Sequence, residues 1–96
     1  MKVNLFFEGI PAVAKVVGKR AFEFDLGGQT VADLLVELIN EYGENIKKIL
    51  WDESSNFDPS VQIVINQRDY VQIDKMAETQ LSEGDTVVFI TLLNGG

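Results

Sequence analysis

The chain has 96 residues and a formal net charge of −7, and it contains neither cysteine nor histidine. This length suits one domain with a modest core, so we expect residues 1–96 to form a single domain. The absence of cysteine excludes disulfides and iron–sulfur ligation by this chain, and the absence of histidine removes the commonest general base and transition-metal ligand. We therefore expect no metal site. The acidic balance argues against nucleic acid as a partner and favours a basic protein partner.

Hydropathy gives no sign of a membrane segment or of a secretion signal. The sequence contains no run of 18 apolar residues, which a spanning helix would need. Residues 1–8 hold one cation and then an acid within a short apolar run, which is too short and too polar for a signal peptide. We expect a cytoplasmic protein that has no membrane partner.

Two strands are predicted at the start of the chain. Residues 2–8 alternate imperfectly, which places Phe6 as the odd apolar residue on a face that is otherwise polar. Residues 21–26 alternate cleanly between apolar and acidic side chains. A break at residues 9–11 and a turn at residues 18–20 lie between them. We expect a hairpin with a loose connection, and its turn type stays open.

A helix with one buried face is predicted over residues 31–42. Thr30 is placed to cap its N-terminus, with Asp33 at the third helical position as in a capping box. Gly43 is expected to end the helix in a left-handed conformation. Apolar residues recur at spacings of three and four along the helix. They are Val31, Leu34, Leu35, Leu38, Ile39 and Tyr42, and all except Tyr42 are expected to pack on Val3, Leu5, Phe22, Phe24, Ile63, Val87 and Phe89.

The middle of the chain predicts short and irregular structure. One or two further helical turns are expected around residues 46–50. Residues 51–60 are polar and rich in turn formers, which predicts a surface loop pinned by Trp51 or Phe57. Gly27 and Gly28 lack the spacing of a nucleotide-binding fingerprint, so we interpret them as the turn before the helix.

The second half predicts a strand over residues 61–66, a turn at 67–69 and a short pairing segment at 70–73. A tight turn at residues 81–85, with Gly84 at the positive-φ position, leads into a last strand that starts at Thr86. This order of elements predicts an α+β fold in which one main helix packs on one face of a mixed sheet.

The last strand leads directly to a terminal pair, Gly95 and Gly96. Residues 93–96 would reach roughly 13–14 Å when extended, at about 3.3–3.6 Å each. The two glycines carry no Cβ, so this end is as thin as a polypeptide can be. We expect a flexible tail at residues 93–96 that can enter another protein's cleft. The alternative is a frayed terminus without a role.

Six short segments, taken in order along nearly the whole chain, carry a family resemblance. They are residues 2–7, 17–19, 30–35, 64–69, 81–87 and the terminal Gly95-Gly96. Together they resemble the MoaD/ThiS-type sulfur-carrier family, which has the ubiquitin-like β-grasp fold. Within it the chain is most similar to the small subunits of molybdopterin synthases, because thiamin-pathway carriers are typically shorter around residues 44–59. Molybdopterin carriers usually have two prolines where this chain has Thr91 and Leu92, and a glycine where it has Gln67.

The resemblance implies a function for the tail. Gly96 would be the covalent site, which a ubiquitin-activating-like adenylyltransferase adenylates with ATP and which a sulfur donor protein then converts to a thiocarboxylate. Leu93, Asn94 and Gly95 would enter the active site of the large subunit of molybdopterin synthase. Sulfur would pass there to the pterin precursor of the molybdenum or tungsten cofactor. The chain would have no catalytic residue of its own and no stably bound cofactor.

A candidate partner surface follows from the alternation of the last strand. If Val87 and Phe89 face the helix, then Val88, Ile90 and Leu92 face the other way, together with Phe6. The alternative is that these are scattered surface hydrophobic residues.

Three other functions stay open on the sequence. The chain could carry sulfur for thiamin or another pathway, or it could be a ubiquitin-like modifier whose Gly96 forms an isopeptide bond with lysine. It could also be an interaction domain with an inert tail.

Overall fold

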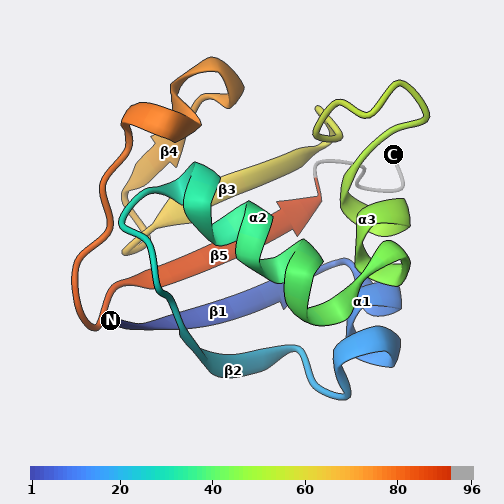
Figure 1. The fold of residues 1–96 in the computed structure, drawn as a ribbon, viewed down its shortest axis with the longest axis horizontal. Coiled ribbons are helices and arrows are strands. Elements are labelled where there is room, and N and C mark those ends of the chain that lie inside the picture. Colours follow the sequence, from blue (N-terminus) through green and yellow to red (C-terminus); the bar gives the residue numbers. More distant parts are fainter. Residues whose placement is uncertain (92–96) are drawn as a thin grey trace.

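The computed structural model describes residues 1–91, and residues 92–96 lie outside the described part. A mixed sheet is crossed on one face by a long helix (Figure 1). The elements in chain order are β1 (Lys2–Glu8), α1 (Pro11–Val17), β2 (Ala21–Asp25), α2 (Val31–Tyr42), α3 (Glu44–Leu50), β3 (Val61–Ile65), β4 (Asp69–Val71), the 3-10 helix η1 (Ile73–Glu78) and β5 (Thr86–Thr91).

The sheet joins two antiparallel pairs through its centre. Its strand order is β2-β1-β5-β3-β4, and β1 and β5 run parallel while every other neighbouring pair is antiparallel. The β1–β5 pair brings Leu5 opposite Val87 and Phe7 opposite Phe89. The predicted α+β fold, with one main helix on one face of a mixed sheet, is confirmed.

Helix α2 begins where its sequence predicts, because the capping box forms. The Thr30 hydroxyl accepts a hydrogen bond from the Asp33 N–H at 3.1 Å, and the Asp33 carboxylate accepts from the N–H groups of Gln29 at 2.9 Å and Thr30 at 3.1 Å. These bonds stabilise the charged form of the carboxylate, so the pKa of Asp33 lies below its usual value. At the other end Gly43 has φ 72° but ψ −155°. The predicted left-handed conformation of Gly43 is therefore right in φ but wrong in ψ. The reason is that the chain continues directly into α3 after this residue.

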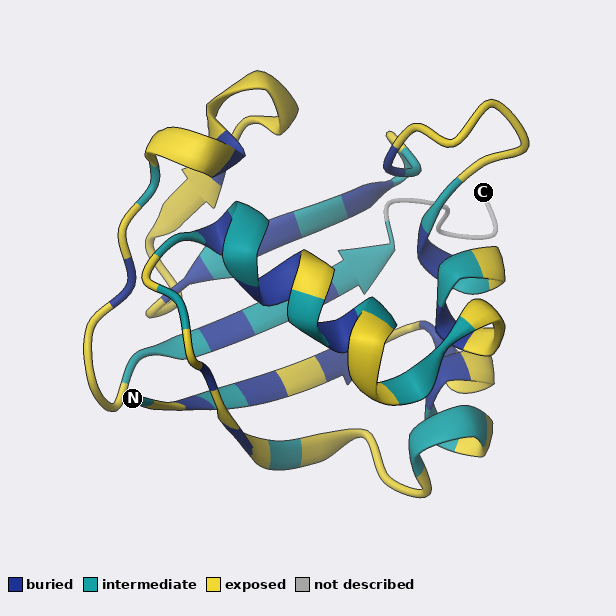
Figure 2. Cartoon of the chain, viewed as in Figure 1, coloured by how far each residue is buried: buried dark blue, intermediate teal, exposed yellow. Residues whose placement is uncertain are grey.

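The hydrophobic core lies between α2 and the sheet, as expected (Figure 2). Of the predicted helix stripe, Ile39 and Tyr42 are only half-buried, and on the sheet Phe22 is too. Phe22 lies on the edge strand β2, where its ring stacks on Phe7 at 6.1 Å and meets Tyr42 edge-on at 6.3 Å between centroids. These rings close one side of the core. The other predicted core residues are buried, namely Val3, Leu5, Phe24, Val31, Leu34, Leu35, Leu38, Ile63, Val87 and Phe89.

The connection between β1 and β2 is not a loose loop, because it contains α1. Pro11 lies in the first turn of this helix and Gly18, with φ 95°, ends it. Val13 is completely buried. A helix of seven residues shows little periodicity and depends on tertiary packing, so its sequence did not reveal it.

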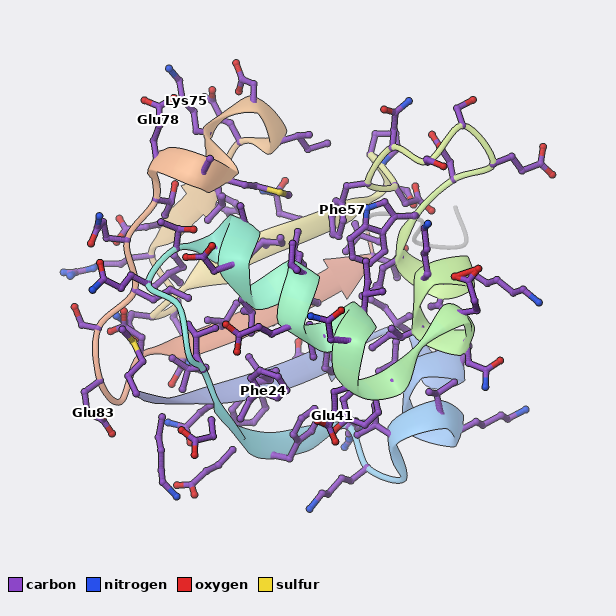
Figure 3. All side chains as sticks on the ribbon, viewed as in Figure 1. Phe24, Glu41, Phe57, Lys75, Glu78 and Glu83 are labelled. Carbon is purple, nitrogen blue, oxygen red and sulfur yellow. The ribbon has the colours of Figure 1, made fainter. Side chains whose placement is uncertain are left out.

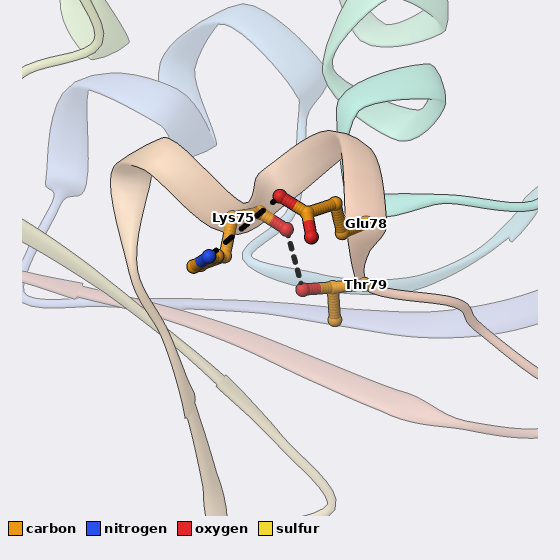
Figure 4. Close-up of polar contacts among 3 residues, drawn as sticks. All are labelled: Lys75, Glu78 and Thr79. Carbon is orange, nitrogen blue, oxygen red and sulfur yellow. Dashed lines mark hydrogen bonds and ion pairs between the residues drawn. The ribbon is translucent and has the colours of Figure 1, made fainter.

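The segment predicted to pair at residues 70–73 is also different. Pairing is confined to β4, and the chain continues into η1, which buries Met76. The Thr79 hydroxyl donates to the Lys75 carbonyl at 2.7 Å, and Lys75 lies 3.8 Å from the Glu78 carboxylate (Figure 4). These contacts are local and polar, so no pattern of apolar residues in the sequence indicates η1.

The predicted surface loop over residues 51–60 is confirmed, and both of its aromatic residues help to hold it. Phe57 is buried and meets Trp51 edge-on at 5.4 Å between ring centroids. Gly84 has φ 85°, as predicted for the turn before β5. None of the helices described over residues 1–91 is long and apolar enough to cross a membrane.

Candidate functional site

Strand β5 is the last described element of the chain, and its end lies between two neighbouring segments. Thr91 is the last residue of this strand and lies opposite Val61 at the start of β3. On its other side lies Gly9, just after β1. A Cβ added to Gly9 would be 2.8 Å from Cγ2 of Thr91, and the φ of Gly9 is +69°. The strand end is therefore held between β3 and the turn after β1, and we name Gly9, Val61 and Thr91 the tail root.

Gly9 has a role that its sequence position alone did not reveal. The pattern marks it only as a strand break, whereas the structure needs its positive φ and its missing side chain. Only the β1–β5 pairing shows that this turn lies against Thr91. Beside it is a surface hollow of about 470 Å³, to which Arg20 contributes the one cation. The hollow is lined by Phe6, Phe7, Glu8, Gly9, Arg20 and Ala21.

The predicted tail follows Thr91 and Leu92 in the sequence. Leu92, Leu93, Asn94, Gly95 and Gly96 lie outside the described residues. The covalent site at Gly96, the flexible tail and the contribution of Leu92 to the partner surface stay predictions.

The sheet face turned away from α2 carries an apolar row. Phe6 on β1 is opposite Val88 on β5, Val88 is opposite Val64 on β3, and Val64 is opposite Tyr70 on β4. Phe6 is 38% exposed and Tyr70 is 72% exposed. We name these four residues the open-face row. Ile90 is half-buried two residues beyond Val88 on the same face.

Phe6, Val88 and Ile90 thus lie together, as the alternation predicts, and the structure adds Val64 and Tyr70 to them. Alternation along β3 gives the face of Val64, but only the register of the β3–β4 turn brings Tyr70 beside it. Asn66 helps to hold that turn against β5. Its side chain accepts from the Thr86 N–H at 2.9 Å and donates to the Asp85 carboxylate at 3.0 Å.

The described residues contain little with which to activate a carboxylate. Residues 1–91 include no group of three or more acidic, histidine or cysteine side chains that could hold a metal. No polar or charged side chain is buried within that range. Tyr42 has a pKa above its usual value, because it is partly desolvated and lies near the Glu41 charge. A phenol that holds its proton more tightly is a poor general base at neutral pH.

Solved structures with this fold include three informative neighbours. The SAMP1 structure from Haloferax volcanii, the small archaeal modifier protein 1, has a TM-score of 0.75 at 16% identity and covers all of both chains. The HVO 2177 protein of the same organism is 31% identical, with a TM-score of 0.68 over all of this chain and 87% of its own. A Pyrococcus furiosus protein assigned as molybdopterin converting factor subunit 1 is 24% identical, with a TM-score of 0.64 over 95% of this chain and 97% of its own.

No protein among those with curated descriptions matches the chain. The family model of the ThiS proteins, in contrast, matches residues 12–96 and so includes all of α1 except Pro11, every later element and the terminal glycines. With the β-grasp arrangement of sheet and helix already established, the chain belongs to the ThiS family of ubiquitin-like sulfur carriers.

Proposed function

We propose that this protein is the sulfur-carrying small subunit of a molybdopterin synthase. The observation that carries the proposal is the position of β5. This strand is bonded on both sides in the centre of the sheet, and it leads to the residues that end in Gly95-Gly96. A reactive carboxyl end would thus project from a strand that is paired on both sides. The match of the family model through residue 96 supports the same assignment.

The proposed chemistry takes place at Gly96 and is supplied by partners. In an activating enzyme, a carboxylate oxygen of Gly96 attacks the α-phosphorus of ATP, and pyrophosphate leaves. The outer sulfur of a persulfide on a donor protein attacks the acyl carbon next, and AMP leaves. A thiol then attacks the resulting acyl disulfide, so a thiocarboxylate remains on Gly96 and a disulfide on the donor. A free carboxylate is ionised at neutral pH and is a poor electrophile, which is why it needs adenylation.

The proposed role of the open face is docking. The open-face row and Ile90 offer apolar side chains that a large synthase subunit would cover, with Leu92 continuing the surface toward the tail. Residues 93–96 would then enter the active site of that subunit, where the thiocarboxylate transfers its sulfur to the pterin precursor. Water would regenerate the carboxylate of Gly96.

The molybdopterin assignment is favoured over the thiamin pathway by the segment around residues 44–59, which folds into α3 and the loop closed by Trp51 and Phe57. The likeness to the converting-factor subunit of Pyrococcus furiosus agrees with it. The second candidate is a protein modifier, and the likeness to SAMP1 favours it. In that case Gly96 would form an isopeptide bond with a lysine of another protein.

Four tail variants test the proposal. Deleting Gly96, or adding residues after it, should abolish thiocarboxylate formation with unchanged thermal unfolding, because a projecting tail buries little. Gly95→Val should reduce sulfur transfer more than complex assembly, since a Cβ would obstruct a narrow channel, and Gly95→Ala should give a smaller loss.

The measurement is the intact mass of the protein after incubation with ATP, a sulfur donor and the cognate activating enzyme. Exchange of one oxygen for sulfur at Gly96 supports the carrier, and a ladder of high-mass conjugates supports the modifier. Sulfur transfer by the protein that lacks Gly96 would rule out both.

A further inference from the structure

The β2 edge of the sheet has backbone groups without partners in the described structure. The Phe7 N–H donates to the Arg20 carbonyl, and the Leu26 N–H donates to the Met1 carbonyl. In an antiparallel pair the residues bonded to the neighbouring strand alternate with residues whose groups point outward. The N–H and carbonyl groups of Ala21, Glu23 and Asp25 therefore point away from β1. No other part of residues 1–91 bonds to them.

A groove runs along this edge between β2 and α2. Its volume is about 430 Å³, and Phe24 and Tyr42 supply its apolar part. In Figure 3, Phe24 on β2 and Glu41 on α2 mark its two sides. The groove is lined by Glu23, Phe24, Asp25, Glu37, Asn40, Glu41 and Tyr42.

Carboxylates lie on both sides of the groove, and its lining contains no cation. Glu37 is fixed there, because its two carboxylate oxygens accept from the N–H groups of Gly27 and Gly28 at 2.8 Å each. The one ion pair within residues 1–91 joins Lys75 and Glu78, so none of the groove carboxylates has a cationic partner in that range.

The charges around the β2 edge indicate which kind of segment can bind there. The nearest bases are Lys2, opposite Asp25 on β1, and Lys19 and Arg20, just before β2. A second copy of this chain would bring a second set of carboxylates against the first, which is unfavourable. A segment rich in lysine or arginine would meet complementary charge on both of its faces.

We propose that the β2 edge binds a basic, extended segment of a partner protein, which adds to the sheet as a strand. Main-chain hydrogen bonds to Ala21, Glu23 and Asp25 would hold the segment, as in other cases of strand addition. Alternate basic side chains would reach Glu23 and Asp25 on one face, and Glu37 and Glu41 on the other. Ala21 lies opposite Phe6, so the site borders the open-face row, but it uses no residue of that row or of the tail and extends beyond the proposed function.

The test uses as its probe a ten-residue peptide in which pairs of lysines alternate with pairs of valines, so that lysines lie on both faces of the extended peptide. It is titrated into the ¹⁵N-labelled protein. We expect chemical-shift changes along β2 and the groove side of α2, and slower hydrogen exchange at the amides of Glu23 and Asp25. A peptide of the same sequence with an N-methyl group on every residue should not bind, because neither of its edges keeps N–H donors. Equal binding of that peptide, or shifts spread over all acidic surfaces, would show non-specific charge attraction and overturn the proposal.

Paired variants separate the edge from net charge. Glu23→Lys with Glu41→Lys should weaken binding of the probe by at least about tenfold, which corresponds to about 1.4 kcal/mol. The control, Glu53→Lys with Asp74→Lys, makes the same change in net charge at exposed residues outside the groove and should bind like the original protein. Equal losses in the two pairs would overturn the proposal. The readout needs no sulfur transfer, so either result leaves the proposed function to its own test.

Discussion

Leu35 and Val36 are neighbours on α2, yet they lie in opposite surroundings. Leu35 is 5% exposed within the core, whereas Val36 is 57% exposed. Successive residues of an α-helix point about 100° apart, so one faces the sheet and the other faces solvent. Burial of apolar area is worth roughly 25 cal/mol per Å², and only Leu35 gains most of that energy. The contribution of each apolar residue to the stability of the fold therefore depends more on the helix face on which it lies than on its type of side chain.

Leu35→Ala is expected to lower the free energy of unfolding by about 2–5 kcal/mol, because it removes packed side-chain volume. Val36→Ala should change it by no more than about 0.5 kcal/mol, because the site is exposed and alanine favours the helix. Urea unfolding of both variants, with the slopes compared, measures this. Equal effects would mean that α2 presents a different face to the sheet.

Among the turns, the connection between β3 and β4 holds the most backbone strain. Asn66 and Gln67 both have positive φ, at 53° and 63°. Asparagine tolerates this region, and Asn66 uses its side chain to bond Asp85 and Thr86. Gln67 has no such compensation among the described bonds.

Gln67→Gly should therefore stabilise the protein. It relieves roughly 1–2 kcal/mol of left-handed strain and costs about 0.5–1 kcal/mol in unfolded-chain entropy, so a gain of up to about 1.5 kcal/mol is expected. Asn66→Gly, the matched control, should destabilise the protein because two hydrogen bonds are lost. Thermal unfolding compares the two. A loss of stability in Gln67→Gly would show that the side chain of Gln67 contributes more than its backbone costs.

An element can be predicted from the sequence when the residues that stabilise it lie close together in the chain. Helix α2 was predicted over residues 31–42, because both its capping residues and its apolar stripe lie within a short stretch of sequence. Helices α1 and η1 were missed, because short helices lack a period and rely on packing. The tail root and the open-face row depend on register between β1 and β5, where Asn4 meets Thr86. No local sequence pattern indicates that β1 pairs with β5, because the two strands lie at opposite ends of the chain. The alternation of apolar residues therefore predicted which side chains share a face of the sheet, but not which of them lie side by side.

At the scale of the whole molecule, the two sides of the sheet serve different purposes. One side is covered by α2 and holds the core, and the other presents the open-face row across four of the five strands. A partner that covers this row would lie directly behind β5 without disturbing the core. Docking and stability can therefore be separated by mutation.

Phe6→Asp combined with Ile90→Asp should leave the monomer folded and abolish binding to the large synthase subunit. Charges in the centre of an apolar interface would remain buried without partners, which is costly. The control is Val36→Asp with Ile73→Asp, which changes two exposed apolar residues outside the row and should retain binding. Circular dichroism of all variants tests whether each monomer is folded, and an affinity measurement tests whether it still binds the large subunit. If Ile90→Asp unfolds the chain, Phe6→Asp with Tyr70→Asp gives the same test, and retained binding would exclude the open face.

The parallel pairing of β1 and β5 also decides how the protein responds to force. An unfolding motor that threads the chain from the tail pulls on β5 along its length. Because β5 is bonded to β1 on one side and to β3 on the other, the pull loads both ladders in shear, and their hydrogen bonds must fail together rather than one by one. Forced unfolding is governed by the height of this barrier and not by equilibrium stability. We expect a motor to release the domain intact more often than it unfolds it, which would return the carrier for another round of use.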